Sequence, residues 1–181
     1  NIKSKWEKID FNTVPSCAMF RLKSSFEKHV PTLFNEWKSK LITGEAVVKG
    51  KQLFPYEIIR ELRSRPGYNV ITEKQWQEIA NNINTSGKLK SVLCVCDVSG
   101  SMESWGRLAK MQAAASFTPK DVAMSLSLII SQIVTGPFKD HIIAFHEEPT
   151  FVVTNQPTVS DRLNCLSRAP WGMSTNLLKV F

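Results

Sequence analysis

Three oxygen-bearing side chains follow an apolar, β-prone run in the second half of this 181-residue chain. The run is Ser91–Cys96, and Asp97, Ser99 and Ser101 come after it at alternate positions. A carboxylate and two hydroxyls are hard oxygen ligands, which suit Mg²⁺ and, less specifically, Ca²⁺ or Mn²⁺. Gly100 permits a tight loop in which alternate side chains point toward one centre. The spacing therefore predicts a divalent-metal site at the end of a strand.

A second loop supplies another oxygen for this site. Thr175 ends the loop 171–175, just before a short segment that we expect to be helical. Ligands of open α/β sheets bind at the carboxyl ends of the strands, and helix N-termini favour anions. An ion held by few carboxylates would attract an acidic group from outside. The alternative interpretation is that Asp97–Ser101 is only a polar strand-to-helix turn.

Three further residues are predicted to form a partner-binding rim around the metal. Trp105 and Trp171 lie in loops beside it, where a tryptophan either packs the rim or contacts a partner. His146 comes directly after a predicted strand and is followed by Glu147 and Glu148. The imidazole of His146 and the two carboxylates have the chemistry of general acids and bases, but a polar loop is the better explanation of these residues.

No catalytic residue is predicted. Asp97 has the position of a nucleophile that forms an aspartyl phosphate, but such sites usually carry a second carboxylate two residues on, where this chain has Ser99. No G-x-S-x-G elbow surrounds Ser99 or Ser101, and no Gly-rich phosphate loop occurs. We therefore expect a non-enzymatic interaction module.

The elements around the metal motif are predicted to alternate between strands and helices, which favours an open α/β sheet. The continuous apolar run 91–96 is typical of a strand buried on both faces. The elements expected after it are a helix from Thr118-Pro119 to about Val134, strands over 141–145 and 150–153, and a helix over 159–167 capped by Thr158. Three strands alone would leave the first with an exposed apolar edge, so we expect the protein to continue beyond Phe181.

The first half of the chain has helical periodicity instead. The expected helices cover residues 24–42 with an interruption at Pro31, a segment that starts at Pro55, and a segment from the capping box 72–75 to about Ile83. Residues 84–87 form a polar linker. We therefore predict a basic helical region at 1–87 and an α/β domain at 88–181.

The net charge of +7 belongs entirely to the helical half. Residues 1–90 hold 16 Lys and Arg against 9 Asp and Glu, whereas residues 91–181 hold 7 of each. A basic surface can meet RNA or another nucleic acid, although a solvated helical surface has the same composition. Trp37 and Trp76 fall on apolar helix faces, so we expect them in the core rather than stacked on bases.

Cysteine usage and hydropathy indicate an intracellular, non-membrane protein. The four cysteines, Cys17, Cys94, Cys96 and Cys165, form no C-x-x-C pair, and with three histidines in the chain zinc is not expected. Reduced thiols are typical of the cytoplasm. No run of about 18 apolar residues occurs, so we expect no membrane span.

The motif Asp97–Met102, taken together with Gly172–Asn176, resembles the metal-ion-dependent adhesion site of von Willebrand factor A domains. The resemblance implies that the two serines of the first motif and Thr175 bind Mg²⁺ directly, and that Asp97 does so directly or through water. It also implies a Rossmann-like sheet, of which this chain has the N-terminal half, and a partner protein that offers an exposed Asp or Glu. The further Asp of that family, from a later strand, has no counterpart before the chain ends.

A narrower resemblance extends over nearly the whole chain. Its motifs are Phe11–Ser16, Leu53–Ile59, Cys96–Met102, Gly136–Lys139 and Trp171–Met173. They resemble an uncharacterised domain-of-unknown-function family of eukaryotes and giant viruses, whose layout is similar to that of the Ro ribonucleoprotein, a helical RNA-binding ring followed by a von Willebrand A-like domain. The resemblance implies RNA as the alternative partner, and a location in the cytoplasm or, for a viral protein, in the virion.

Overall fold

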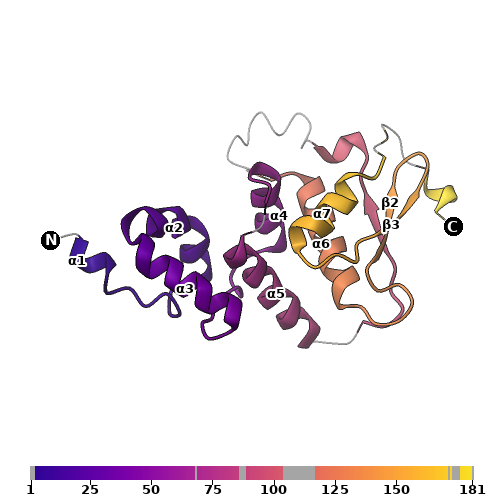
Figure 1. The fold of residues 1–181 in the computed structure, drawn as a ribbon. Coiled ribbons are helices and arrows are strands. Elements are labelled where there is room, and N and C mark those ends of the chain that lie inside the picture. Colours follow the sequence, from indigo (N-terminus) through magenta and orange to yellow (C-terminus); the bar gives the residue numbers. More distant parts are fainter. Residues whose placement is uncertain are drawn as a thin grey trace. The chain divides into compact units, whose positions relative to one another are not determined.

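The computed structural model describes residues 3–67, 69–85, 89–103, 117–170, 172 and 176–180. It has a mixed α/β fold, with helices in both halves and a small mixed sheet in the second half (Figure 1). The helices of the first half are α1 (Lys3–Trp6), α2 (Ser16–His29), α3 (Pro31–Thr43), α4 (Pro55–Ser64) and α5 (Val70–Thr85). The second half contains β1 (Cys94–Asp97), the 3₁₀ helix η1 (Gly100–Glu103), α6 (Pro119–Ile133), β2 (His141–Phe145), β3 (Thr150–Val153), α7 (Val159–Ser167) and the 3₁₀ helix η3 (Leu177–Lys179).

The chain forms two compact units, which do not follow the halves of the sequence. Unit 1 contains Asn1–Phe54 with Tyr68–Asn82, and unit 2 contains Pro55–Gly67 with Ile83–Phe181. Helix α4 therefore belongs with the sheet. The domain boundary expected between residues 87 and 88 lies outside the described residues and stays a prediction.

Unit 1 has an aromatic core. Phe34 is 1% exposed and lies 5.1 Å from Phe11 and 5.6 Å from Trp37, measured between ring centroids. Trp37 and Trp76 are both buried, as their helical spacing predicts. Pro31 occupies the first turn of α3, where its missing N–H costs no helical hydrogen bond, so the expected interruption at this residue is confirmed.

Two predicted helix starts are wrong. Helix α2 begins at Ser16, well before the expected start at residue 24. Helix α5 begins at Val70, and the Asn69 side chain accepts hydrogen bonds from the backbone N–H groups of Ile71 (3.0 Å) and Thr72 (3.3 Å). Thr72 therefore lies inside the helix, and its hydroxyl accepts a hydrogen bond from the buried Lys23 ammonium at 3.0 Å. Asn69 caps the helix because its carboxamide oxygen satisfies N–H groups that have no partner within the first turn.

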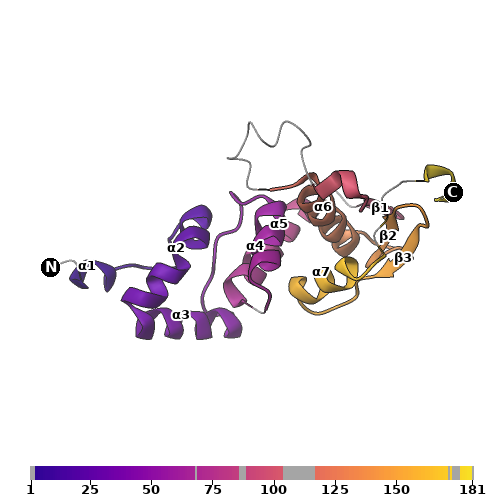
Figure 2. The same ribbon diagram turned by 90° about the horizontal axis from the view of Figure 1, so that it is seen from above.

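Unit 2 contains the sheet, in the order β1-β2-β3. Strand β1 is parallel to β2, with Cys96 opposite Ala144, and β3 is antiparallel to β2. Helix α6 makes the crossover between the two parallel strands, and its N-terminus has the expected Thr118 cap followed by Pro119. Helices α6 and α7 cover the same face of the sheet (Figure 2), where Ala144 is completely buried.

The opposite face of the sheet is open in the described part of the chain. Val95, Phe151 and Val153 are 44%, 55% and 52% exposed. The expectation that β1 is buried on both faces is therefore wrong for the described residues, whose helices pack on only one face of these three strands. The described residues also contain no helix with the length and apolar character needed to cross a bilayer.

Candidate metal centre

The metal motif stands at the carboxyl end of β1, next to the carboxyl end of β2. Pairing continues one residue beyond β1, since the Val98 N–H donates to the Phe145 carbonyl at 3.1 Å. Val98 is fully buried and anchors the start of the loop. From there η1 (Gly100–Glu103) turns the chain, and the Met102 N–H donates to the Ser99 carbonyl at 3.1 Å. The sheet therefore holds one end of the loop firmly.

Two hydrogen bonds link the three residues of the motif. The Asp97 Oδ1 accepts a hydrogen bond from the Ser99 N–H at 2.8 Å, which folds the loop back over the strand end. The Ser99 and Ser101 hydroxyl oxygens lie 3.1 Å apart. Ser99 is buried and Ser101 is exposed, so this pair leads from the interior to solvent.

The spacing of the two serine hydroxyl oxygens can be compared with that of ligands around a small hard cation. In octahedral Mg²⁺ sites with ligands at about 2.1 Å, neighbouring oxygens are about 3.0 Å apart. The two serine hydroxyls form a hydrogen bond of 3.1 Å, a separation that is also close to that spacing. No cluster of three or more His, Cys, Asp or Glu side chains suited to a metal occurs among the described residues, so a softer or more acidic site is not found there.

Of the second loop, residues 171–175, the structure describes position 172 only. Thr175, Trp105 and Trp171 lie outside the described residues, so their predicted roles as ligand and rim stay predictions. Gly172 is described, and its carbonyl accepts a hydrogen bond from the Gly100 N–H at 3.1 Å. This bond ties the second loop to the residue between the two serines.

His146 contacts the second loop and the residue that follows it. It is only 5% exposed, its Nδ1 accepts a hydrogen bond from the Glu148 N–H at 3.3 Å, and its carbonyl accepts one from the Asn176 N–H at 3.3 Å. A Cβ on Gly172 would lie 3.0 Å from the His146 Cβ, so the loop approaches closely only because this residue is glycine. The position of His146 on a partner-binding rim stays a prediction, while its hydrogen bonds give it a packing role.

The structure also places charged residues beside the motif that the sequence pattern does not reveal. Glu103, at the end of η1, pairs with Lys120 and lies 3.8 Å from Arg63, while Arg63 also pairs with Asp121 at 2.5 Å. Asp121 belongs to the capping box of α6. The box is visible in the sequence as Thr118-x-x-Asp121, but the ion pairs join residues far apart in the chain, which spacing cannot reveal.

Two of the cysteines, Cys94 and Cys96, lie on β1 just before the metal motif. All four cysteines are free. Burial raises the pKa of the Cys96 thiol to about 11, and burial also raises the pKa of Cys94. Both thiols are therefore protonated at neutral pH, which makes them poor nucleophiles and poor metal ligands.

Comparisons with known proteins identify the sequence family. The model described as "Domain of unknown function (DUF7788)" matches residues 91–181, and "Domain of unknown function (DUF2828)" matches residues 2–89. The chain is 27% identical over 190 residues to "Uncharacterized protein L728" of Acanthamoeba polyphaga mimivirus. That alignment includes 98% of this chain and 31% of the relative, so the chain spans about a third of the relative's length. No solved structure matches.

These matches support the expectation of an uncharacterised family found in eukaryotes and giant viruses. They name two domains of unknown function and a giant-virus relative. A von Willebrand A domain is not among the matches, so that finer assignment depends on the motif and the topology alone.

Proposed function

For this chain, which belongs to the DUF7788 family, we propose a non-enzymatic protein-interaction module that binds an acidic partner group through a divalent metal. The observation that carries the proposal is the 3.1 Å separation of the Ser99 and Ser101 hydroxyls at the end of β1. Asp97 lies at the start of the same turn, so three hard oxygen groups are available within five residues. Mg²⁺ is the ion that this set favours.

The fold assignment in this proposal is a von Willebrand A-like sheet. Its support is the loop position at the carboxyl ends of two parallel strands, β1 and β2, which is where open α/β sheets bind ligands. The crossover through α6 joins these two strands, and the antiparallel β3 completes the described sheet.

Each residue has a separate part in the site. Ser99 and Ser101 would hold Mg²⁺ through their hydroxyls, and Asp97 would hold it directly or through water, while Thr175 is proposed as the ligand from the second loop. When bound, Mg²⁺ supplies a coordination position that a partner's Asp or Glu can fill. Asp97 also orients the turn by accepting the Ser99 N–H at 2.8 Å.

Titration calorimetry with MgCl₂ and MnCl₂ on the whole chain tests the metal claim. The double variant Ser99→Ala with Ser101→Ala should lose binding, because it removes both hydroxyl ligands. Ser160→Ala, a half-buried serine on α7, is the matched control and should bind as the parent does. A parent protein that binds neither ion, or a double variant that binds equally well while folded by circular dichroism, refutes the metal site.

The acidic-partner claim needs its own measurement. With Mn²⁺ bound, addition of glutarate should displace coordinated water and lower the water-proton relaxation rate. An unchanged rate at saturating glutarate would contradict an open coordination position, even where the metal itself binds.

Binding of RNA by the helical part is the second candidate, and one observation favours it. The whole excess of 7 positive charges lies in residues 1–90. Trp37 and Trp76 are buried, so the proposal depends on phosphate contacts and not on base stacking by these two residues. Affinity for single-stranded RNA should then fall steeply with added salt, and a flat salt response would exclude such contacts.

A further inference from the structure

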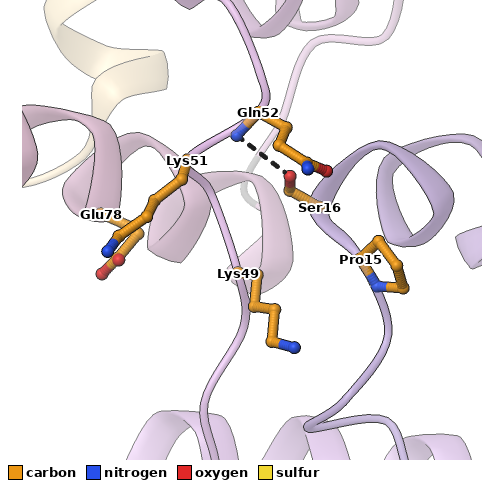
Figure 3. Close-up of a pocket in the computed structure, with 6 residues that line it drawn as sticks. All are labelled: Pro15, Ser16, Lys49, Lys51, Gln52 and Glu78. Carbon is orange, nitrogen blue, oxygen red and sulfur yellow. Dashed lines mark hydrogen bonds between the residues drawn. The ribbon is translucent and has the colours of Figure 1, made fainter.

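A pocket of about 440 Å³ opens on the surface of unit 1 (Figure 3). Three separate parts of this unit contribute to its wall. The lining residues are Pro15 and Ser16 at the start of α2, Lys49, Lys51 and Gln52 on the segment after α3, and Glu78 on α5. Small-molecule sites have volumes of about 300–1,000 Å³, so the pocket is large enough for one compact ligand.

Hydrogen bonds hold the wall in place. The Ser16 hydroxyl accepts from the Gln52 N–H at 3.2 Å. Behind the wall, the fully buried Gln75 carboxamide donates to the carbonyls of Ser16 at 3.1 Å and Lys49 at 3.2 Å. One side chain thus joins both sides of the pocket. The segment with the two lysines is also pressed against α5, since a Cβ on Gly50 would lie 2.7 Å from the Gln75 carbonyl oxygen. The pocket is therefore pre-formed.

The charge in the pocket favours an anion. Lys49 and Lys51 provide two ammonium groups against the single carboxylate of Glu78. Neither ammonium is in an ion pair with a residue of the described chain, and the Lys49 Nζ donates to the Thr13 carbonyl at 3.1 Å, which holds it beside the start of α2. That helix has no side-chain cap and no acidic residue in its first turn, so its dipole adds to the attraction of an anion.

A buried polar atom next to the wall lacks a partner. The Gln75 Oε1 is buried and accepts no hydrogen bond from the described residues, although its amide nitrogen makes two. Buried polar groups are nearly always paired with protein or water. An acceptor of this kind suits a water molecule or a ligand hydroxyl. Gln75 itself does not line the pocket, so this acceptor lies behind the wall that its amide nitrogen holds together.

We propose that this pocket binds a phosphomonoester of nucleotide size, with the phosphate held by Lys49 and Lys51. The pyrrolidine ring of Pro15 and the lysine stems provide apolar wall for the remainder of the ligand. The phosphate comes from a free mononucleotide or from the end of an RNA strand, and both carry the same group. The proposal is independent of the metal centre, since all its residues lie in unit 1.

Titration calorimetry on the whole chain tests the proposal with AMP, adenosine, inorganic phosphate and a short RNA with a 5′-phosphate or a 5′-hydroxyl. AMP should bind and adenosine should not. Lys49→Ala with Lys51→Ala should weaken AMP by about tenfold or more, since each charge-assisted contact is worth a substantial part of that factor. Lys8→Ala with Lys28→Ala removes the same charge from exposed positions of unit 1 outside the pocket and should have little effect.

Glu78→Gln separates the proposal from a loss of folding. This variant removes the one carboxylate that opposes the phosphate, so AMP should bind more tightly by a few-fold, a gain that unfolding cannot produce. Tighter binding of 5′-phosphorylated RNA than of AMP identifies a strand end as the source, and the reverse identifies a free nucleotide. Equal binding of adenosine and AMP, no binding of any phosphate probe, or equal losses in the two lysine double variants would overturn the proposal.

Discussion

A methyl group at position 172 tests whether the two loops of the candidate metal centre are held together as the contacts indicate. The Cβ of Gly172→Ala would lie 3.0 Å from the His146 Cβ, 3.1 Å from its Nδ1 and 3.3 Å from the Glu147 nitrogen. Carbon atoms prefer separations of about 3.5–4.0 Å, so the groups must move apart by several tenths of an ångström. The Gly172 backbone is outside the left-handed region, so the cost is steric and not conformational.

The displacement should fall on the second loop. His146 follows β2 directly, is buried, and is held by the hydrogen bond from Glu148, so it has little room to yield. Movement of position 172 then weakens the 3.1 Å hydrogen bond from Gly100. Overpacking costs about 1–3 kcal/mol and a lost hydrogen bond about 0.5–1.5 kcal/mol. We expect the free energy of unfolding of Gly172→Ala to fall by about 2 kcal/mol.

Urea unfolding measures the stability, and Mg²⁺ titration measures the consequence for the site. Gly100 stands between the two serines, so Gly172→Ala should also weaken Mg²⁺ binding. Gly44→Ala is the control, because its φ of 84° strains an alanine without any atom within 4 Å, and it lies in unit 1. It should lose stability and keep its Mg²⁺ affinity. Unchanged unfolding of Gly172→Ala would refute the steric reasoning, and unchanged affinity in a destabilised Gly172→Ala would refute the link between the loops.

Three further outcomes are expected. Burial raises the pKa of Cys96 from 9.0 to about 11, so the unfolded chain loses this proton first. The free energy of unfolding should therefore be independent of this thiol below about pH 9 and should fall by up to about 3 kcal/mol as the pH rises to about 11. Denaturant midpoints at the two pH values measure this fall, and Cys96→Ala should abolish it. Arg162→Met should lower the free energy of unfolding in urea by about 3–5 kcal/mol, because it leaves the Asp140 carboxylate without its counter-charge. That carboxylate is 11% exposed and lies 2.5 Å from the guanidinium. Adding Asp140→Asn should recover part of the loss. Thr118→Ala should cost about 1 kcal/mol in the same assay by removing the hydroxyl that accepts the Asp121 N–H, and a neutral variant would show that the cap is dispensable.

The elements with local signals could be predicted from the sequence. Strands β2 and β3 have the predicted bounds, and α6 begins at Pro119 behind the Thr118 cap, because hydrophobic periodicity and capping residues are properties of neighbouring positions. The predicted start of α5 is wrong because Thr72-Glu73-Lys74-Gln75 has the form of a capping box. A tertiary contact places Thr72 inside the helix instead. Its side chain is buried and accepts a hydrogen bond from Lys23, 49 positions away in the chain.

The candidate site could be predicted only in part for the same reason. Asp97, Ser99 and Ser101 are close in sequence, and the structure brings them together at the end of β1. The hydrogen bond from Gly100 to Gly172 joins positions far apart, and a glycine in a loop gives no signal of the residue that approaches it. The pocket in unit 1 shows the same limit, since Gln75 links Ser16 to Lys49 across three segments.

The parallel pairing of β1 with β2 has a consequence for how the protein folds. Antiparallel β2 and β3 are joined by a short connection, whereas β1 can pair with β2 only after the long crossover through α6 has closed. Contacts between distant parts of a chain form slowly, because the entropy of closing the loop is lost before the contacts repay it. The oxygen-bearing residues at the end of β1 are close in sequence, so they are near one another even in the unfolded chain. The strand that positions them, however, pairs with β2 only late in folding. The candidate metal centre would therefore mature among the last parts of unit 2, and a cation that binds there would slow unfolding rather than speed folding.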